Sequence, residues 1–203
     1  MEIRKKFSTL LLLLSLLLAL LPLSANRSFT VKPVKLLSDV LKTDVSFTVD
    51  QVAEFIVKED STIQLIDLRS SEKFRKQTIP GAVNIPYNDF IKKDPEIYLN
   101  NKNIRNIFYS NGNIEPYYAL VYARGLRYNN SFVMDGGVSE WIRTIIETKF
   151  TGDRITAREN ALFEIRRRAG DMFTGLNSLP DSLKTRFLDS KKFSAKKLDG
   201  GCQ

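Results

Sequence analysis

The chain of 203 residues contains no histidine and a single cysteine. The absence of histidine excludes a serine–histidine or cysteine–histidine nucleophile pair, a histidine-ligated zinc or haem, and an imidazole acid or base. A single cysteine excludes an intramolecular disulfide and a paired-cysteine redox or zinc motif. We therefore expect neither a cofactor nor a metal site.

The remaining composition is that of a globular protein, with 43% hydrophobic and 27% charged residues. The length allows one domain and an additional segment. The net charge of +8 is concentrated at the two ends, because basic side chains outnumber acidic ones by two in residues 1–25, by two in residues 26–150 and by four in residues 151–203. A nearly neutral middle does not fit a nucleic-acid-binding face, so no nucleic-acid partner is expected.

The N-terminus has the pattern of a secretory signal. Basic residues Arg4, Lys5 and Lys6 precede an almost continuous leucine run from Leu10 to Leu23. Two forms remain open. Cleavage after Ala25 would give a soluble protein, although Leu23 then occupies the −3 position, where a small side chain is preferred. Alternatively, residues 7–25, which carry no charge, are an uncleaved membrane anchor. Both forms predict export, to a periplasmic or extracellular location.

We divide the chain into four segments. Residues 1–25 are the signal peptide or anchor, and residues 26–45 are a connector with a short helix. Residues 46–148 alternate strand and helix patterns, and residues 149–203 are a basic helical extension with a mobile Gly-Gly-Cys tail. Strands that alternate with helices predict an α/β fold in which a parallel sheet is covered by helices on both faces.

Short local signals place the elements of the middle segment. Thr48 and Gln51 fit a capping box that opens a helix reaching about Glu59. The other predicted features are strands at 63–66, 104–109 and 132–134, a polar helix anchored by Phe74, a helix with Pro116 in its first turn and Gly125 as its C-terminal cap, a glycine turn at Asp135-Gly136-Gly137, and a core position for Trp141.

The extension is predicted to contain two helices that pack on the sheet domain. Thr156 and Glu159 form a second capping box, which opens a helix from Ala157 to Ala169 that is stopped by Gly170. A second helix starts near Pro180. The apolar stripe of the first helix consists of Ala161, Leu162 and Ile165. Its last turn is basic and consists of Arg166, Arg167 and Arg168.

Four motifs in residues 46–148 together resemble the rhodanese (sulfurtransferase) domain. In chain order they are Leu65-Ile-Asp-Leu-Arg69, Phe74 followed by Ile79-Pro-Gly-Ala-Val-Asn-Ile-Pro86, Phe108-Tyr-Ser110, and Met134-Asp-Gly-Gly-Val-Ser-Glu-Trp141. The resemblance implies a five-stranded parallel sheet. It also implies that the loop after the predicted strand at 104–109 is an anion-binding loop. In the family, this loop begins with a catalytic cysteine and often ends with arginine.

In this chain the resemblance places Ser110 at the cysteine position and Glu115 at the arginine position, with Asn111, Gly112, Asn113 and Ile114 between them. A serine oxygen cannot form a persulfide, and its hydroxyl does not ionise at neutral pH without a base. Glu115 adds a negative charge where the family binds an anion. We therefore predict a degenerate loop with no catalytic residue, and an exported rhodanese-like domain that acts as a binding or scaffold module for an unidentified protein partner.

Three further residues complete the predicted site. Asp67 and Arg69 match the family's D-x-R pattern, and they are expected to support the loop as a structural ion pair or as a cap near it. Cys202 is the one thiol of the chain and lies on a basic tail. It is either an incidental terminal residue or a reactive thiol that carries sulfur or links two chains as a dimer. A noncanonical sulfurtransferase or sulfur carrier, in which Cys202 works with the Ser110–Glu115 loop, is therefore the alternative to a non-catalytic module.

Overall fold

The computed structural model describes residues 2–19, 31–41, 43–92, 95–149 and 156–197. The cleavage position after Ala25 and the Gly-Gly-Cys tail with Cys202 lie outside these residues. Among the described residues, no helix combines the length and the hydropathy that a membrane crossing requires. The N-terminal helix α1 (Glu2–Ala19) carries leucines whose side chains are at least half exposed.

In the described part of the chain, five strands form one parallel sheet in the order β1-β5-β4-β2-β3. The predicted five-stranded parallel sheet is confirmed. The strands are β1 (Ser46–Phe47), β2 (Ile63–Asp67), β3 (Val83–Asn84), β4 (Arg105–Tyr109) and β5 (Ser131–Met134).

Successive side chains of each strand point to opposite faces of the sheet, so a strand buried on both faces is apolar at consecutive positions. On β2, Leu65 packs into one core cluster and Ile66 into the cluster on the opposite face. On β4, Ile107 packs into the first of these clusters and Phe108 into the second. This is why the sequence shows short continuous apolar runs at these strands.

Helices cover both faces. The first face is covered by α3 (Val49–Val57), α4 (Ser71–Lys76), α8 (Gly137–Trp141) and the π-helical turn η2 (Ile142–Ile146). The second face is covered by α5 (Tyr87–Lys92), α6 (Glu96–Leu99) and α7 (Ile114–Gly125). Helix α2 (Pro33–Val40) and the 3₁₀ turn η1 (Thr43–Val45) precede β1, and α2 packs against α7.

The capping box that opens α3 is present, because the Thr48 hydroxyl accepts from the Gln51 N–H and the Gln51 side chain accepts from the Thr48 N–H. Phe74 and Trp141 are buried, as predicted. The predicted cap at Gly125 is wrong. Gly125 is the last helical residue of α7, and the left-handed residue that follows the helix is Arg127, with φ +72°. The Tyr128 N–H then reaches back to the Ala123 carbonyl oxygen, which satisfies the end of the helix.

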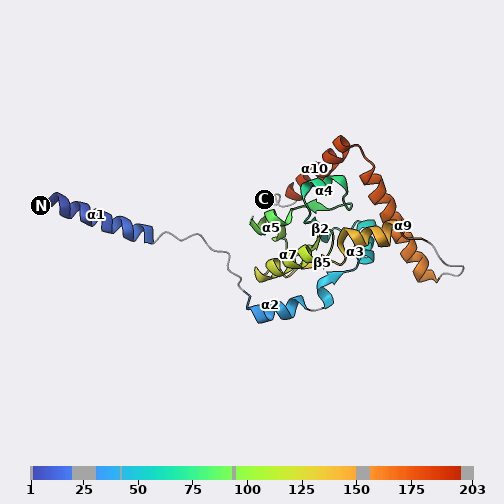
Figure 1. Cartoon of the computed structure of the whole chain (residues 1–203), viewed down its shortest axis with the longest axis horizontal. Helices are drawn as coiled ribbons and strands as arrows, with labels where there is room; N and C mark the ends of the chain where they lie inside the picture. Colours follow the sequence, from blue (N-terminus) through green and yellow to red (C-terminus); the bar gives the residue numbers. More distant parts are fainter. Residues whose placement is uncertain (1, 20–30, 42, 93–94, 150–155, 198–203) are drawn as a thin grey trace.

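The C-terminal extension forms α9 (Ala157–Asn177) and α10 (Asp181–Lys197), which pack on the first face of the sheet domain (Figure 1). The capping box of Thr156 and Glu159 and the start of the second helix after Pro180 are confirmed. The predicted stop at Gly170 is wrong, because α9 continues for seven more residues. A Cβ added to Gly170 would lie 3.5 Å from the Ile145 carbonyl oxygen, an ordinary contact distance, so α9 runs along η2 at this point without requiring a glycine.

The predictions of the buried face of α9 and of a basic last turn are also wrong, because the helix is longer than predicted. Ala161 and Leu162 are exposed, whereas Ile165 packs against the core cluster that contains Ala169 and Phe173. The three arginines at 166–168 lie in the middle of the helix. Arg166 forms a two-bond ion pair with Asp50 of α3, at 2.7 Å for each bond. Arg166 therefore contributes to the contact between α9 and the sheet domain, whereas Arg167 pairs with Glu164 and Asp171 of α9 itself.

Candidate functional site

The loop after β4 lies at the position where parallel α/β sheets bind ligands. β4 pairs with β5 on one side and with β2 on the other. The chain leaving β4 crosses to β5, and the chain leaving β2 crosses to β3 on the opposite side. Such a reversal opens a crevice at the carboxyl ends of the strands. Ser110, the first residue after β4, is only 3% exposed at this edge.

Backbone hydrogen bonds attach the loop to the start of α8. The Val138 N–H donates to the Ser110 carbonyl oxygen at 2.9 Å, and the Ser139 N–H donates to the Asn111 carbonyl oxygen at 3.2 Å. The Gly136 N–H donates to the Asn113 side-chain oxygen at 2.6 Å. The first amides of a helix lack intrahelical acceptors, so the loop supplies them. The loop conformation is thereby fixed from the side of β5.

The predicted glycine turn is confirmed and has a specific reason. Gly136 and Gly137 both have positive φ, at +75° and +58°. A Cβ on Gly137 would overlap the Ser110 carbonyl oxygen and crowd the backbone of Asn111. Gly137 is therefore required both for its own backbone conformation and for the close approach of the loop.

The structure brings the two ends of the loop together. The Ser110 hydroxyl donates to the carboxylate of Glu115. Glu115 lies in the first turn of α7, where the helix dipole favours a negative charge. A carboxylate of the chain itself therefore lies at the helix end that would attract an anion. The hydroxyl of Ser110 is buried and already used as a donor, and among the described residues no imidazole or amine contacts the pair.

Apolar and aromatic side chains surround the outer side of this loop. Ile114 is 72% exposed and Tyr118 is 59% exposed. Tyr87 of α5 lies close enough for electrostatic coupling to the loop, since partial burial together with Tyr118 and Glu115 raises the pKa of its hydroxyl. We call Tyr87, Ile114, Glu115 and Tyr118 the loop rim.

Asp67 and Arg69 form the predicted ion pair at the end of β2. The Arg69 guanidinium donates to both carboxylate oxygens, with the shortest bond at 2.6 Å, and also to the Gln77 carbonyl oxygen. Both side chains are almost fully buried. Burial opposes the charge of Arg69, but the hydrogen bonds and charge of Asp67 raise its pKa overall.

The pair lies beside Tyr109, which precedes Ser110, and no hydrogen bond joins it to residues 110–115 in the described part of the chain. Burial, followed by the charge of Asp67, raises the pKa of the Tyr109 hydroxyl well above its usual value. Nearby, Asn177 of α9 exchanges hydrogen bonds with the backbone of Thr78, and Lys184 of α10 donates to Asn177. Asp67 and Arg69 therefore lie on the side of the sheet that carries the C-terminal extension.

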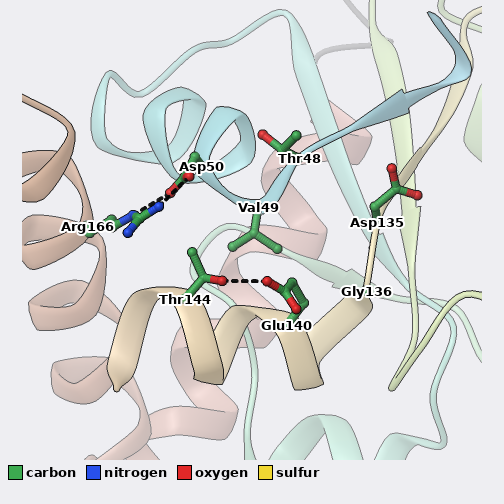
Figure 2. Close-up of a pocket in the computed structure, with 8 residues that line it drawn as sticks. All are labelled: Thr48, Val49, Asp50, Asp135, Gly136, Glu140, Thr144 and Arg166. Atoms are coloured by element: carbon green, nitrogen blue, oxygen red, sulfur yellow. Dashed lines mark hydrogen bonds and ion pairs between the residues drawn. The ribbon is translucent and has the colours of Figure 1, made fainter. Parts of the chain in front are cut away.

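Sequence reasoning missed one further hollow, of about 350 Å³, at the carboxyl ends of β1 and β5 (Figure 2). Its polar side chains largely satisfy one another. Asp50 pairs with Arg166, and Glu140 accepts from the Thr144 hydroxyl at 2.6 Å, a bond that with Arg143 lowers the pKa of Glu140. Arg166, which lines one side of the hollow, lies 116 positions after Asp50 in the sequence, so no local sequence pattern could indicate the hollow. The full lining is Thr48, Val49, Asp50, Asp135, Gly136, Glu140, Thr144 and Arg166.

Nothing in the described residues resembles a metal centre, since no three potential carboxylate, thiolate or imidazole ligands lie together. The candidate thiol Cys202 lies outside the described residues, so the structure does not place it relative to the loop.

Comparison with known proteins gives the family. The family model for the rhodanese-like domain matches residues 48–144. No curated protein sequence matches the chain. Among solved structures, the chain is similar to a rhodanese-like domain from Anabaena sp. (17% identity, 56% of this chain and 91% of that one, TM-score 0.45). It is also similar to a human single-domain sulfurtransferase (21% identity, 49% of this chain and 96% of that one, TM-score 0.42). A third similar structure is a Rhodopseudomonas palustris protein described as a possible tyrosine phosphatase (16% identity, 58% of this chain and 94% of that one, TM-score 0.45). By the match of the family model, residues 48–144 of this chain are a rhodanese-like domain.

Proposed function

We propose that this chain is an exported protein whose rhodanese-like domain performs no sulfur transfer and acts as a binding module. The observation that carries the proposal is the hydrogen bond from the Ser110 hydroxyl to the Glu115 carboxylate. These residues occupy the two positions at which the family resemblance expects a cysteine and an arginine. The bond places a fixed negative charge in the loop and uses the hydroxyl that would otherwise face a substrate.

The chemistry of these two residues opposes the usual reaction. Sulfur transfer needs a thiolate that forms a persulfide, and it needs positive charge around the sulfur. Ser110 offers a hydroxyl, and Glu115 would repel an anionic sulfur donor such as thiosulfate. Pro116 removes one backbone donor from the first turn of α7. An anionic donor is thus disfavoured at the loop before any bond is made or broken.

The loop rim supports binding of another protein. Tyrosine is enriched in the centres of protein interfaces, where its ring buries a large area, and the buried core of an interface is more apolar than the remaining surface. Ile114 and Tyr118 are four positions apart on α7, so these exposed side chains lie on one face of the helix, next to Glu115. A partner with a basic or hydrogen-bond-donating residue at the centre of its contact would complement the Glu115 carboxylate.

Export is proposed from the N-terminal sequence, in which a basic start precedes the leucine run. The measurement is fractionation of the source cells, together with the mass of the mature N-terminus. A chain that begins near residue 26 indicates cleavage, and an intact chain in the membrane fraction indicates an anchor. Recovery of the intact chain from the cytosol would contradict export.

The absence of sulfur transfer is tested by incubating the protein with thiosulfate and measuring sulfane sulfur on the protein by mass spectrometry, with cyanide as the acceptor for turnover. We expect neither turnover nor a persulfide for the unmodified chain. A double variant, Ser110→Cys with Glu115→Arg, restores a thiol and a cation at the loop ends and is expected to take up sulfur. This variant shows that the assay and the fold are competent.

A Cys202→Ser variant provides the second comparison. If the unmodified chain turns over sulfur and Cys202→Ser does not, the noncanonical carrier is correct and the binding-module proposal is wrong. Non-reducing electrophoresis of the same two proteins reports separately whether Cys202 links two chains.

A further inference from the structure

Helix α2 is apolar on two different sides. Leu36 is buried, and Val40 packs against the small core cluster formed with Val45, Leu120 and Val133. The other apolar side chains of α2 and of its C-cap are strongly exposed. They are Val34 at 83%, Leu37 at 61% and Leu41 at 73%. A spacing of three and then four residues places these three on one stripe of the helix. We call them the α2 stripe.

The orientation of the α2 stripe is fixed by the packing of the opposite side. The Arg124 guanidinium of α7 donates to the Asp39 carbonyl oxygen at 3.1 Å, near the C-terminal end of α2. Helix α2 also packs along α7, at the edge of the domain (Figure 1). Leu36 and Val40 anchor it there, so the helix cannot roll to bury the stripe. Three large apolar side chains are therefore held facing outward by the fold itself.

The sequence before α2 indicates what covers the stripe. Residues 7–25 carry no charge, and only seven residues separate Ala25 from Pro33 at the start of α2. Seven residues span about 25 Å at most. If residues 7–25 remain in a membrane as an anchor, α2 stays within that distance of the lipid surface. The tether thus keeps the stripe close to a bilayer without any additional partner.

Charge favours the same occupant. Lys32 and Lys35 are exposed at the N-terminal end of α2, and Arg27 lies in the short tether. Basic side chains beside an apolar helix face are the pattern of an interfacial helix, which buries its apolar side chains among acyl chains and places its cations among anionic headgroups.

We propose that the α2 stripe lies on the surface of an anionic lipid bilayer and fixes the orientation of the rhodanese-like domain relative to the membrane. The proposal rests on the anchored form of the proposed export. It goes beyond that form by assigning a second, peripheral membrane contact to the folded domain. With α2 on the bilayer, the N-terminal tether and one edge of the domain are both held, so the domain does not rotate freely above the membrane.

The test uses the full chain in vesicles of phosphatidylcholine with phosphatidylglycerol. In a Cys202→Ser background, a single cysteine replaces Val34, Leu37 or Leu41 and carries an environment-sensitive fluorophore. Ile97 of α6 is the matched control, because it is an aliphatic residue that is 70% exposed outside α2. Circular dichroism of each labelled chain verifies that the fold is retained.

At the three stripe positions we expect the fluorescence emission to shift to the blue, quenching by iodide to fall several-fold, and quenching by a nitroxide on the acyl chains to appear. None of these changes is expected at position 97. If the chain floats with the vesicles but the stripe labels behave like the label at 97, the α2 contact is wrong and the anchor stands. If the chain does not float, the anchored form itself fails and the proposal fails with it. If the labels become protected without vesicles, with increasing protein concentration, a second copy covers the stripe and the lipid contact is overturned.

Discussion

Ser110 and Glu115 join the two ends of the loop after β4 through their side chains. The hydroxyl remains at the end of β4, and the carboxylate takes the place at the start of α7 where the helix dipole attracts negative charge. Each group satisfies the other. At the scale of single residues, the two ends of the loop are therefore held together by their own side chains.

Tyr109 provides a prediction about pH. Its buried hydroxyl makes no hydrogen bond of normal geometry within the described chain, and burial raises its pKa above the ordinary value of 10.0. Below pH 10.0 the hydroxyl is neutral in both states and has no effect. At higher pH the unfolded chain loses this proton while the folded chain keeps it, so the free energy of unfolding falls with pH, by up to about 1.4 kcal/mol per unit.

Tyr109→Phe is therefore expected to lose less stability above pH 10 than the unmodified chain, with little change at neutral pH. Urea unfolding of both proteins between about pH 8 and about pH 11 measures this difference. Equal slopes for the two proteins would show that Tyr109 does not titrate on unfolding.

Gly137 provides a prediction about the loop backbone. In Gly137→Ala the added Cβ meets the Ser110 carbonyl oxygen, and φ is held at +58°. We expect a loss of about 2 kcal/mol or more in the free energy of unfolding. Gly112→Ala is the matched control in the same loop, because no atom lies within 4 Å of its added Cβ. Its stability is expected to stay within about 0.5 kcal/mol of the unmodified chain. A similar loss in both variants would argue against the close approach.

At the scale of elements, α9 and α10 attach to the sheet domain through a small number of well-placed polar contacts. The Asn177 side chain accepts from the Thr78 N–H at 2.9 Å and from Lys184 at 2.7 Å, and it donates to the Thr78 carbonyl oxygen at 2.9 Å. Burial lowers the pKa of the Lys184 ammonium, because a charge is costly away from water, and the Lys76 carbonyl oxygen and the Asn177 side-chain oxygen accept its hydrogen bonds.

Asn177→Ala should therefore destabilise the protein by about 2–3 kcal/mol, because buried groups on Thr78 and Lys184 lose their partner. Ser178→Ala is the control, since Ser178 is an exposed neighbour whose hydroxyl contacts only the carbonyl oxygen of Gly175 in its own helix. Thermal unfolding followed by circular dichroism compares the two. Equal melting temperatures for both variants would mean that the contact does not hold the extension.

The elements that the sequence predicted correctly are those set by local chemistry. Capping boxes at Thr48 and Thr156 act within four residues, and the strands are marked by their apolar runs. The end of α9 depended on distant atoms. A glycine such as Gly170 ends a helix only where no later residue stabilises its continuation. Here Phe173 and Leu176, which follow Gly170 in α9, are buried. Tertiary packing therefore outweighed the local cost of glycine, which is about 1 kcal/mol.

The candidate site divides in the same way. The family resemblance located the loop from Ser110 to Glu115, and its two ends do meet in the structure. The ion pair of Asp67 and Arg69 was also predicted, but its neighbourhood was not. Its closeness to the C-terminal extension depends on how α9 and α10 return across the sheet, and no spacing in the sequence encodes that return.

At the scale of the whole molecule, the rhodanese-like domain and its extension share one hydrophobic core. Trp141, the single tryptophan of the chain, is fully buried, and its ring lies 6.3 Å from the ring of Phe173 on α9. Ala169 and Leu188 belong to the same cluster as Leu65 of the central sheet. We therefore expect the extension and the domain to unfold together.

Urea unfolding followed by Trp141 fluorescence and by far-ultraviolet circular dichroism should give coincident transitions. The fluorescence reports on the contact with α9, and the dichroism reports on all helices. Phe173→Ala creates a cavity in this contact and should shift both transitions together, by about 3–5 kcal/mol. An earlier fluorescence transition, with most of the helical signal retained, would show that the extension detaches as a separate unit.

The backbone bonds from Val138 and Ser139 to the carbonyl oxygens of Ser110 and Asn111 have a consequence for engineering. These two bonds hold the loop through its backbone, and neither needs a side chain at positions 112 and 114. New side chains can therefore be introduced at these two positions while the shape of the loop is kept. Randomising positions 112 and 114 in a display library would use this loop as a ready-made frame for selecting new binding proteins.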